Sequence, residues 1–276
     1  MIDLQQTTNA LLSFLTTPNK DWSFCTLSFM VAFLVFFAVY LYINHYRKAW
    51  LKAYVVLFGL LFAYKANGAL MVLLPITTLL SWFLTKKMMR LQRGKPRRIG
   101  LSLVILIELL PLLYYKYTNF TLDILNHLLQ SNFAPLQLLL PIGISFYTFQ
   151  AISYTVDVYK ERFPKTTGLL EYTFYLTFFP LLIAGPITRA KILIPQIDAP
   201  QPNNKQLINT GLWLIICGLL KKALVADYLA QYNNWIFADP LAYTGFENLM
   251  GVLGFTLQIY CDFSGYSDMA IGIAAL

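Results

Sequence analysis

The sequence predicts an all-α protein with several transmembrane helices, from its composition, its uncharged runs and the placement of its charges. Of the 276 residues, 58% are hydrophobic and 12% are charged, and the mean hydropathy is +0.57. Soluble domains carry about 25% charged residues. Residues 24–43 contain no charged side chain, and a helix of that length crosses a hydrocarbon core of about 30 Å. The membrane bilayer is therefore the first expected partner of this chain.

The basic residues gather in two short loops between apolar stretches. Residues 45–52 contain His45, Arg47, Lys48 and Lys52 and no acidic residue. Residues 86–98 contain seven lysines and arginines and no acidic residue. Short loops rich in Lys and Arg lie on the cytoplasmic side of a membrane. Both loops are predicted to be cytoplasmic, which places the N-terminus outside. The net charge of +8 is explained by such loops, and nucleic-acid binding is not expected.

The stretch 53–84 is apolar but is interrupted at Lys65, Asn67 and Gly68. It is predicted to form either two short spans or a re-entrant hairpin, so that it crosses an even number of times between the two basic loops. Further apolar segments follow at 136–156, 169–184, 206–220 and 246–276.

Residues 99–115 form another predicted span, which contains Glu108. A charged residue in a membrane helix faces the protein interior or a water-filled cavity. Glu108 is therefore expected either to pair with a donor on a neighbouring helix or to take part in chemistry. Residues 117–135 mix leucines with polar side chains, which predicts an amphipathic helix at the membrane interface rather than a crossing.

Several of the later segments contain helix breakers. Pro141 and Gly143 interrupt one segment, and Pro180, Gly185 and Pro186 interrupt another. Irregular backbone at membrane depth is tolerated only where protein or a cavity satisfies the freed amides. The sequence therefore predicts broken helices around a funnel or tunnel.

Three strings of polar and aromatic residues lie inside these segments, at 140–150, 179–189 and 258–269. Lipid would not tolerate their polar groups, so they are expected to face the tunnel. The candidate lining or supporting residues are Ser145, Tyr147, Gln150, Arg189, Gln258, Tyr260, Asp262, Ser264, Tyr266 and Asp268.

Together the strings LPIGISFYTFQ, FPLLIAGPITR and QIYCDFSGYSDM, with GLLKKALVADYLA at 218–230, resemble the membrane-bound O-acyltransferase family. The similarity is to its bacterial branch of alginate O-acetylation, peptidoglycan O-acetylation and teichoic-acid D-alanylation proteins, and it covers roughly residues 50–276. The resemblance implies one transmembrane domain over residues 1–276, with a partial fold of that family in which broken and re-entrant helices surround a central tunnel.

The resemblance also implies an activity. The complete protein would transfer an acyl group, expected to be acetyl, from a cytoplasmic donor toward a cell-surface polysaccharide outside a bacterial inner membrane. The donor would be acetyl-CoA or an acyl carrier protein thioester, and a partner acyltransferase outside the cytoplasm is expected. No bound cofactor or metal ion is expected, since no metal-ligand spacing joins the cysteines, which are Cys25, Cys217 and Cys261.

Two interpretations remain open for the charged candidates. Asp262 and Asp268 either cap a broken helix, as Asp does at helix N-termini, or line the tunnel and orient a donor or a catalytic group. Arg189 would hold a phosphate or carboxylate of the donor, or would anchor a lipid headgroup. Lys221 and Lys222 are interpreted as an interfacial charge pair at a helix end.

Acyl transfer to a hydroxyl needs a general base, and histidine is the usual one. The chain contains only His45 and His127, which lie outside the three strings and are expected at the surface. The resemblance implies that the family's histidines follow the third string, beyond Leu276, so it implies no catalytic residue within this chain. The chain is expected to be truncated at its C-terminus and inactive alone. The alternative is an inactive membrane scaffold or remnant.

Overall fold

A computed structural model describes residues 17–18, 22, 24–162, 167–198 and 204–276. Within these ranges the chain is helical and contains no strand, which confirms the all-α prediction. Its contacts divide it into two compact units. The first comprises Met1–Trp22, Phe36–Ile183 and Ile187–Pro200, and the second comprises Ser23–Val35, Ala184–Pro186 and Gln201–Leu276.

Three helical stretches are long and apolar enough to cross a membrane: Leu27–Tyr46, Lys48–Met89 and Lys95–Leu129. They match the uncharged run 24–43 and the apolar segments 53–84 and 99–115. The first of them is helix α2, Leu27–Tyr46. The protein is therefore a membrane protein, as its composition predicts.

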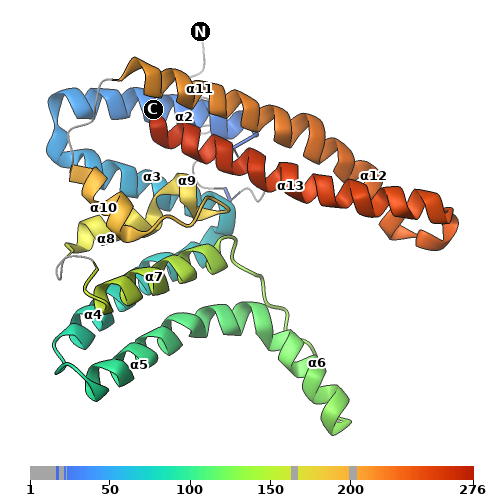
Figure 1. Ribbon diagram of the computed structural model, residues 1–276, viewed down its shortest axis with the longest axis horizontal. Coiled ribbons are helices and arrows are strands. Elements are labelled where there is room, and N and C mark those ends of the chain that lie inside the picture. The colour runs from blue at the N-terminus through green and yellow to red at the C-terminus, as the bar shows by residue number, and fades with distance from the viewer. Residues whose placement is uncertain (1–16, 19–21, 23, 163–166, 199–203) are drawn as a thin grey trace. The chain divides into compact units, whose positions relative to one another are not determined.

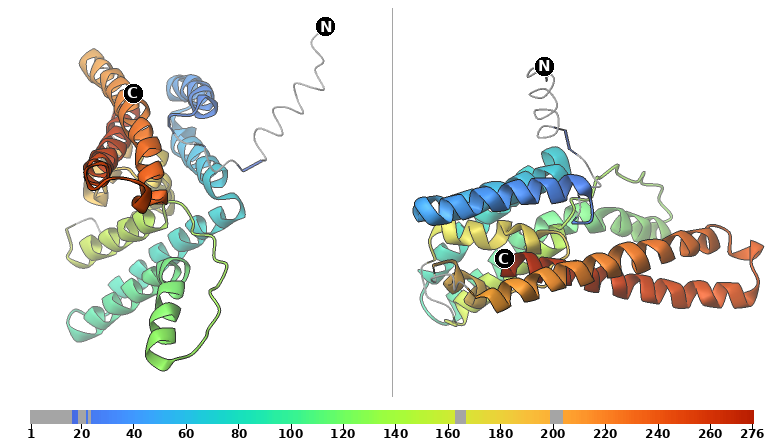
Figure 2. Two further views of the ribbon diagram at one scale, coloured as in Figure 1. Left: turned by 90° about the vertical axis from the view of Figure 1, so that its right-hand side faces the viewer. Right: turned by 90° about the horizontal axis from the view of Figure 1, so that it is seen from above.

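The interrupted segment 53–84 folds as two helices joined by a tight turn. Helix α3 (Leu51–Asn67) follows a 3-10 turn, η1 (Lys48–Trp50), and leads through a second one, η2 (Gly68–Val72), into α4 (Leu73–Met89). Gly68 has φ 57°, a conformation that costs glycine little. The chain changes direction there (Figures 1 and 2).

The next stretch is a bent helix of three parts. Helix α5 (Lys95–Leu112) continues through a π-helical turn, η3 (Leu113–Tyr117), into α6 (Thr118–Leu129). Pro111 lies inside α5, where its ring removes a backbone hydrogen bond and favours a kink. Figure 1 shows α6 turning away from the line of α5.

An extended segment, 130–143, leads to the helices that carry the first two strings. Helix α7 (Ile144–Tyr159) starts after Gly143, which has φ 83° and lies so close to the backbone of Leu182 that a side chain would clash. Helices α8 (Leu169–Thr177), α9 (Phe179–Leu182) and α10 (Ala190–Asp198) follow. The breaks predicted at the prolines and glycines of these strings are confirmed.

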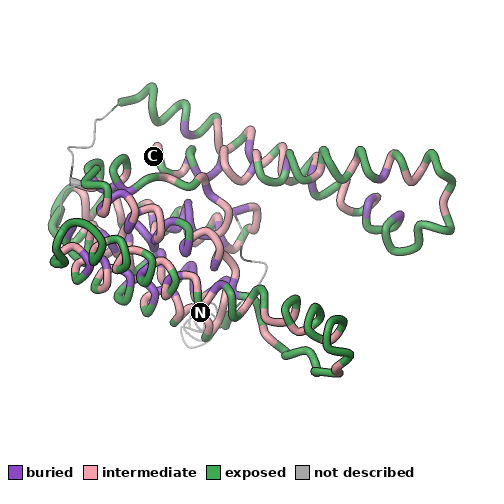
Figure 3. The backbone as a smooth tube through the Cα atoms, turned by 60° about the horizontal axis from the view of Figure 1, so that its bottom comes forward, coloured by how far each residue is buried: buried purple, intermediate pink, exposed green. Residues whose placement is uncertain are grey.

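The core of the first unit lies where α7, α8 and α10 meet α4. Its buried members are Ala151, Tyr154, Val158, Tyr172, Tyr175, Leu176, Ala190 and Ile194. Trp82 and Met89 of α4 pack against them. Buried positions concentrate in these helices (Figure 3), whereas α6 buries none of its residues.

The second unit contains a long antiparallel helix pair. Helix α11 (Lys205–Leu220), a π-helical segment η4 (Lys221–Ala226) and α12 (Asp227–Ala238) run along α13 (Gly245–Ala275), with the short turn η5 (Pro240–Ala242) between them (Figures 1 and 2). Helix α13 is continuous through 258–268. The helix break that the sequence suggested at Asp262 and Asp268 is therefore wrong.

Glycines bring the two long helices close together. A Cβ atom on Gly218 would lie 2.5 Å from the carbonyl oxygen of Gly265, and one on Gly272 would lie 2.5 Å from that of Gly211. Small residues at membrane helix contacts allow the backbones to approach closely in this way. The contact at Gly265 positions the ionic cluster described below.

Candidate functional site

Glu108 is the centre of a polar network buried within the first unit. Its Oε1 accepts hydrogen bonds from Ser81 Oγ of α4 at 2.5 Å and from Thr155 Oγ1 of α7 at 2.8 Å. Ser81 Oγ also lies 2.6 Å from the hydroxyl of Tyr172 on α8, and Thr155 Oγ1 lies 2.9 Å from Thr85 Oγ1. Glu108 is 2% exposed. The expected pairing of Glu108 with donors on neighbouring helices is confirmed.

The string at 140–150 places its polar side chains on the buried face of α7. Gln150 is buried, and its Nε2 donates to the carbonyl oxygen of Tyr175 at 3.3 Å. The hydroxyl of Tyr175 donates in turn to the backbone oxygens of Gln150 at 3.3 Å and Thr188 at 2.9 Å. Ser145 is half-buried in the first turn of the helix. These bonds tie α7 to the segment that precedes Arg189.

Arg189 is exposed at the start of α10, where its backbone oxygen accepts from the amides of Ile192 and Leu193. Among the described residues its guanidinium makes no ion pair. The guanidinium is therefore available to an anionic group, and its position fits the anionic group of a donor and that of a lipid headgroup equally well.

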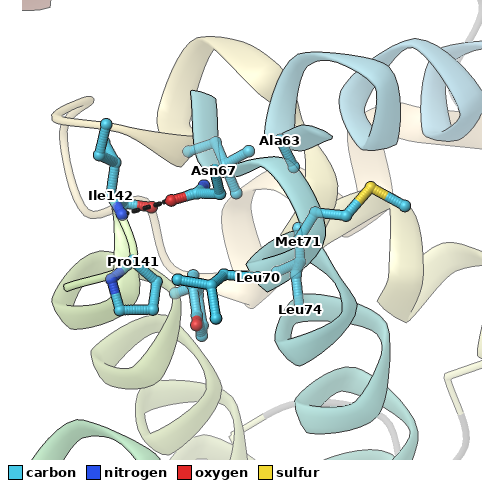
Figure 4. Close-up of a pocket in the computed structure, with 9 residues that line it drawn as sticks. Ala63, Asn67, Leu70, Met71, Leu74, Pro141 and Ile142 are labelled. Atoms are coloured by element: carbon cyan, nitrogen blue, oxygen red, sulfur yellow. Dashed lines mark hydrogen bonds between the residues drawn. The ribbon is translucent and has the colours of Figure 1, made fainter. Parts of the chain in front are cut away.

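A small hollow lies beside Tyr147, between the turn after α3 and the start of α7 (Figure 4). Asn67 closes one side of it: its Oδ1 accepts from the amide of Ile142 at 2.5 Å, and its Nδ2 donates to the carbonyl oxygen of Ile142 at 3.2 Å. The lining residues are Ala63, Asn67, Leu70, Met71, Leu74, Pro141, Ile142, Tyr147 and Leu182. The wall is mostly apolar.

The third string supplies an ionic cluster within the second unit. Lys221 Nζ lies 2.6 Å from Asp268 Oδ2 and donates to Ser264 Oγ at 3.0 Å. Lys222 Nζ lies 2.7 Å from Asp227 Oδ1 and 2.7 Å from Asp262 Oδ1. Two lysines thus meet three aspartates. Oppositely charged groups compensate one another in this way inside membrane helix bundles.

Gly265 explains why these charges meet. A Cβ atom there would lie 2.8 Å from Gly218 O, 3.1 Å from Lys222 N and 3.3 Å from Lys221 Cβ. Asp262 and Asp268 come three residues before and after this closest contact, so they flank it on α13. The two lysines lie in a π-helical segment, and such segments frequently mark functional sites.

Two predictions about the charged residues therefore need correction. Asp262 and Asp268 do not cap a helix, because α13 continues past both and their carboxylates bind lysines. Lys221 and Lys222 do not form a pair at a helix end, since the helical backbone continues through η4 into α12. The sequence pattern contained both sets of residues, but it gave no sign that they bind each other.

The remaining residues of the third string have separate surroundings. Gln258 Oε1 accepts from Asn233 Nδ2 of α12 at 2.7 Å. Tyr266 stacks on Phe24 with ring centroids 4.6 Å apart. Tyr260 is 66% exposed, so it points away from this helix contact. The string is thus a helix with one polar, paired side rather than a row of equivalent lining residues.

Both histidines lie outside these clusters. His45 is exposed in the last turn of α2, and His127 is exposed in the last turn of α6. Their expected surface positions are confirmed. The partners that the sequence did not reveal are Ser81, Thr155, Asn67 and Asn233, which are small polar residues inside apolar helices or at their ends.

Comparison with known proteins identifies the family. The chain is 40% identical over 188 residues to the probable alginate O-acetylase AlgI of Pseudomonas putida, an alignment that covers 67% of this chain and 38% of that protein. It is 33% identical over 221 residues to the peptidoglycan O-acetyltransferase of Helicobacter pylori, covering 70% and 42%. The teichoic acid D-alanyltransferase of Bacillus subtilis is 24% identical over 175 residues, covering 62% and 42%.

The chain belongs to the membrane-bound O-acyltransferase family. The resemblance of its polar strings to that family is thus confirmed. No family model matches the chain. The chain spans less than half the length of these curated relatives.

Proposed function

We propose that this chain is part of an O-acyltransferase that moves an acetyl group toward a cell-surface polysaccharide. The observation that carries this proposal is the 40% identity to a probable alginate O-acetylase over 67% of the chain. The peptidoglycan O-acetyltransferase relative supports the same acyl group and the same class of acceptor. The proposed location is the bacterial inner membrane, crossed several times.

The proposed reaction is acyl transfer from a thioester to a hydroxyl. A base takes the proton of the acceptor hydroxyl, the oxygen attacks the carbonyl carbon, and the thiol leaves. The proposed donor is acetyl-CoA or an acyl carrier protein thioester, and the proposed further partner is an acyltransferase outside the cytoplasm. A tunnel, as the family resemblance implies, would bring donor and acceptor together.

Within this proposal the described residues supply the scaffold of the tunnel. The Glu108 network fixes α7, and with it Ser145, Tyr147 and Gln150. The ionic cluster fixes the polar side of α13, and Arg189 is free to bind an anionic part of the donor.

We further propose that residues 1–276 have no turnover alone. General base catalysis contributes about 10²- to 10⁴-fold, and His45 and His127, which are both exposed, belong to neither polar cluster. To test this, residues 1–276 are expressed in a strain without its own polymer O-acetylation, and acetyl esters on the envelope polysaccharide are measured. Acetylation that disappears with His45→Ala or His127→Ala would show that one of them is the base.

The function itself is tested by deleting the gene that encodes the chain and measuring ester-linked acetate on the surface polysaccharide. We expect the esters to disappear in the deletion strain and to return with the natural gene. Lys221→Met and Asp268→Asn in that gene should each restore less than a tenth of them at equal protein levels. Asp123→Asn, an exposed change on α6, is the matched control and should restore them fully.

Unchanged esters in the deletion strain would refute the acetyltransferase proposal. A scaffold role, the alternative, predicts a different pattern. In that case deletion removes the esters, but both cluster variants restore them as well as the control does.

A further inference from the structure

Two asparagines of α6 hold the extended segment that follows it. Asn126 Nδ2 donates to the carbonyl oxygen of Phe133 at 3.0 Å, and the amide of Phe133 donates to Asn126 Oδ1 at 2.8 Å. Asn119 makes the same pair of bonds with Leu136, both at 2.9 Å. Each side-chain amide thus satisfies both backbone polar groups of one residue. We call these two contacts the asparagine clamps.

The clamps match in spacing along the helix and along the extended segment. Asn119 and Asn126 are seven residues apart, about 10.5 Å along an α-helix. Phe133 and Leu136 are three residues apart, about 10 Å along an extended chain. The segment therefore runs antiparallel to α6 in a defined register.

The clamps also decide which face of α6 the segment occupies. Successive residues of an α-helix are about 100° apart, which puts Asn119 and Asn126 on one side with Asp123 and His127. The opposite side carries five apolar side chains, each at least 36% exposed: Phe120, Ile124, Leu125, Leu128 and Leu129. Thr121 lies among them, and its hydroxyl donates to the carbonyl oxygen of Tyr117 within the helix at 2.8 Å. We call this side the apolar arc. Because the segment is held on the polar side, it cannot cover this arc.

The geometry points to lipid as what covers the apolar arc: we propose that α6 lies in the membrane interface with this arc against the acyl chains. Helix α6 is the continuation of the spanning helix α5, and the 35-residue stretch Lys95–Leu129 would be about 52 Å long if straight. A hydrocarbon core is about 30 Å thick. The bend after Pro111 turns α6 away from the line of α5 (Figure 1), as an interfacial helix requires.

In this position the clamps supply hydrogen-bond partners to backbone groups that lie near lipid. Non-helical backbone near the hydrocarbon loses its water partners, and an unsatisfied polar group there is strongly unfavourable. The clamps satisfy the amide and carbonyl groups of Phe133 and Leu136. They let an extended segment lie beside a helix seated in lipid. By the predicted topology this is the face of the membrane opposite the basic loop 86–98.

The test places a fluorophore on each side of α6 and measures its distance from lipid. The three cysteines are replaced by serine in the full chain, and single cysteines at Leu128 or Leu129 carry a bimane label. Asp123→Cys, exposed on the polar side, is the matched control. Each protein is reconstituted in vesicles of phosphatidylcholine and phosphatidylglycerol, of which phosphatidylglycerol makes up one fifth of the lipid. The lipids carry bromine at either shallow or deep positions of their acyl chains. Elution of each variant as a single species in detergent confirms folding.

We expect shallow bromines to quench the Leu128 and Leu129 labels at least threefold more than the Asp123 label. Equal quenching on the two sides would overturn the proposal. Stronger quenching by deep than by shallow bromines would also overturn it, because α6 would then cross the membrane. Labels at Leu128 and Leu129 that are unquenched in vesicles, yet shielded from water in native membranes, would assign the arc to a protein partner instead.

Discussion

Glu108 is a carboxyl group that joins three helices through one of its oxygens. Its Oε1 accepts from Ser81 and Thr155, while its Oε2 is buried and accepts no hydrogen bond from the described residues. We therefore expect Glu108→Gln, which keeps one acceptor oxygen, to change stability little. Glu108→Ala removes the acceptor that the Ser81 and Thr155 hydroxyls share and leaves Tyr172 and Thr85 as their remaining partners, and it should destabilise the protein by about 2–3 kcal/mol. Thermal unfolding in detergent measures both.

The glutamine variant is the decisive control for this network. If Glu108→Gln unfolded as early as Glu108→Ala, the network would need a charged carboxylate rather than an acceptor oxygen. Ser102→Ala, an exposed change on the same helix, should leave the unfolding temperature unchanged.

The ion pair of Lys221 and Asp268 supports a second prediction at this scale. Lys221→Met leaves Asp268 without its cation, and the Asp268 side chain is only 21% exposed. We expect a loss of about 1–3 kcal/mol, below the value for a fully buried pair. The double variant Lys221→Met with Asp268→Leu should recover at least half of that loss, because no unpaired charge remains. If the double variant lost as much as the two single variants together, the pair would contribute nothing through mutual attraction.

These residue-level partners were only half predictable from the sequence. The cost of Asp262 and Asp268 in an apolar segment required compensation, and that requirement was predicted correctly. Their partners are lysines about forty positions earlier, and a periodic pattern carries no signal for such a distant pair. Asp and Ser close together in sequence instead favoured a helix cap, which was wrong.

At the scale of elements, the contact between α11 and α13 depends on glycine. A side chain at Gly265 would meet backbone atoms of Gly218 and Lys222, which cannot move aside as a flexible side chain can. We expect Gly265→Ala to separate the helices slightly and to cost about 1–3 kcal/mol. Gly245→Ala in the first turn of α13, where a Cβ atom meets nothing within 4 Å, is the matched control and should be neutral or stabilising. Equal unfolding temperatures for the two variants would contradict the close contact.

The asparagine clamps predict where backbone amides are protected. In Asn126→Ala the amide of Phe133 loses its acceptor, and in Asn119→Ala the amide of Leu136 does. Hydrogen exchange at each amide should accelerate at least tenfold in its own variant, since protection reports local opening. Asn126→Asp keeps the acceptor for Phe133 and should retain most of the protection. Exchange that stayed slow in both alanine variants would show that the segment is held by something else.

Helices were easier to predict than the joints between them. Long apolar runs located the three spanning stretches, and prolines and glycines located the breaks around α7 and α9. The π-helical segments η3 and η4 contain no proline of their own, and they were not predicted. Asparagines usually indicate turns, so the clamping role of Asn119 and Asn126 was missed as well.

At the scale of the whole molecule, the basic loops and the spanning stretches together predict a topology. Helices α3 and α4 contain 17 residues each, about 26 Å per helix, which nearly matches the hydrocarbon core. The turn Gly68–Val72 should then lie on the outer side and both basic loops on the cytoplasmic side. Single cysteines at Val72 and Lys95 test this with a membrane-impermeant maleimide on intact spheroplasts. Val72→Cys should react and Lys95→Cys should not, and the reverse pattern would invert the topology.

Some properties of the whole molecule can be predicted from composition, and others cannot. Membrane residence and helical class follow from mean hydropathy and charge placement, which are properties of the entire chain. The tunnel stays a prediction. The same holds for a single domain over residues 1–276.

The asparagine clamps fix the register between α6 and its neighbouring segment, because seven residues of helix span about the same length as three residues of extended chain. One residue inserted between Asn119 and Asn126 would turn the second asparagine about 100° away and move it about 1.5 Å along the axis. One inserted between Phe133 and Leu136 would shift the segment by about 3.3 Å and turn its backbone over. An insertion in the helix would therefore not compensate for an insertion in the segment. Natural variants of this region should therefore exchange one apolar side chain of the arc for another and hardly vary in length.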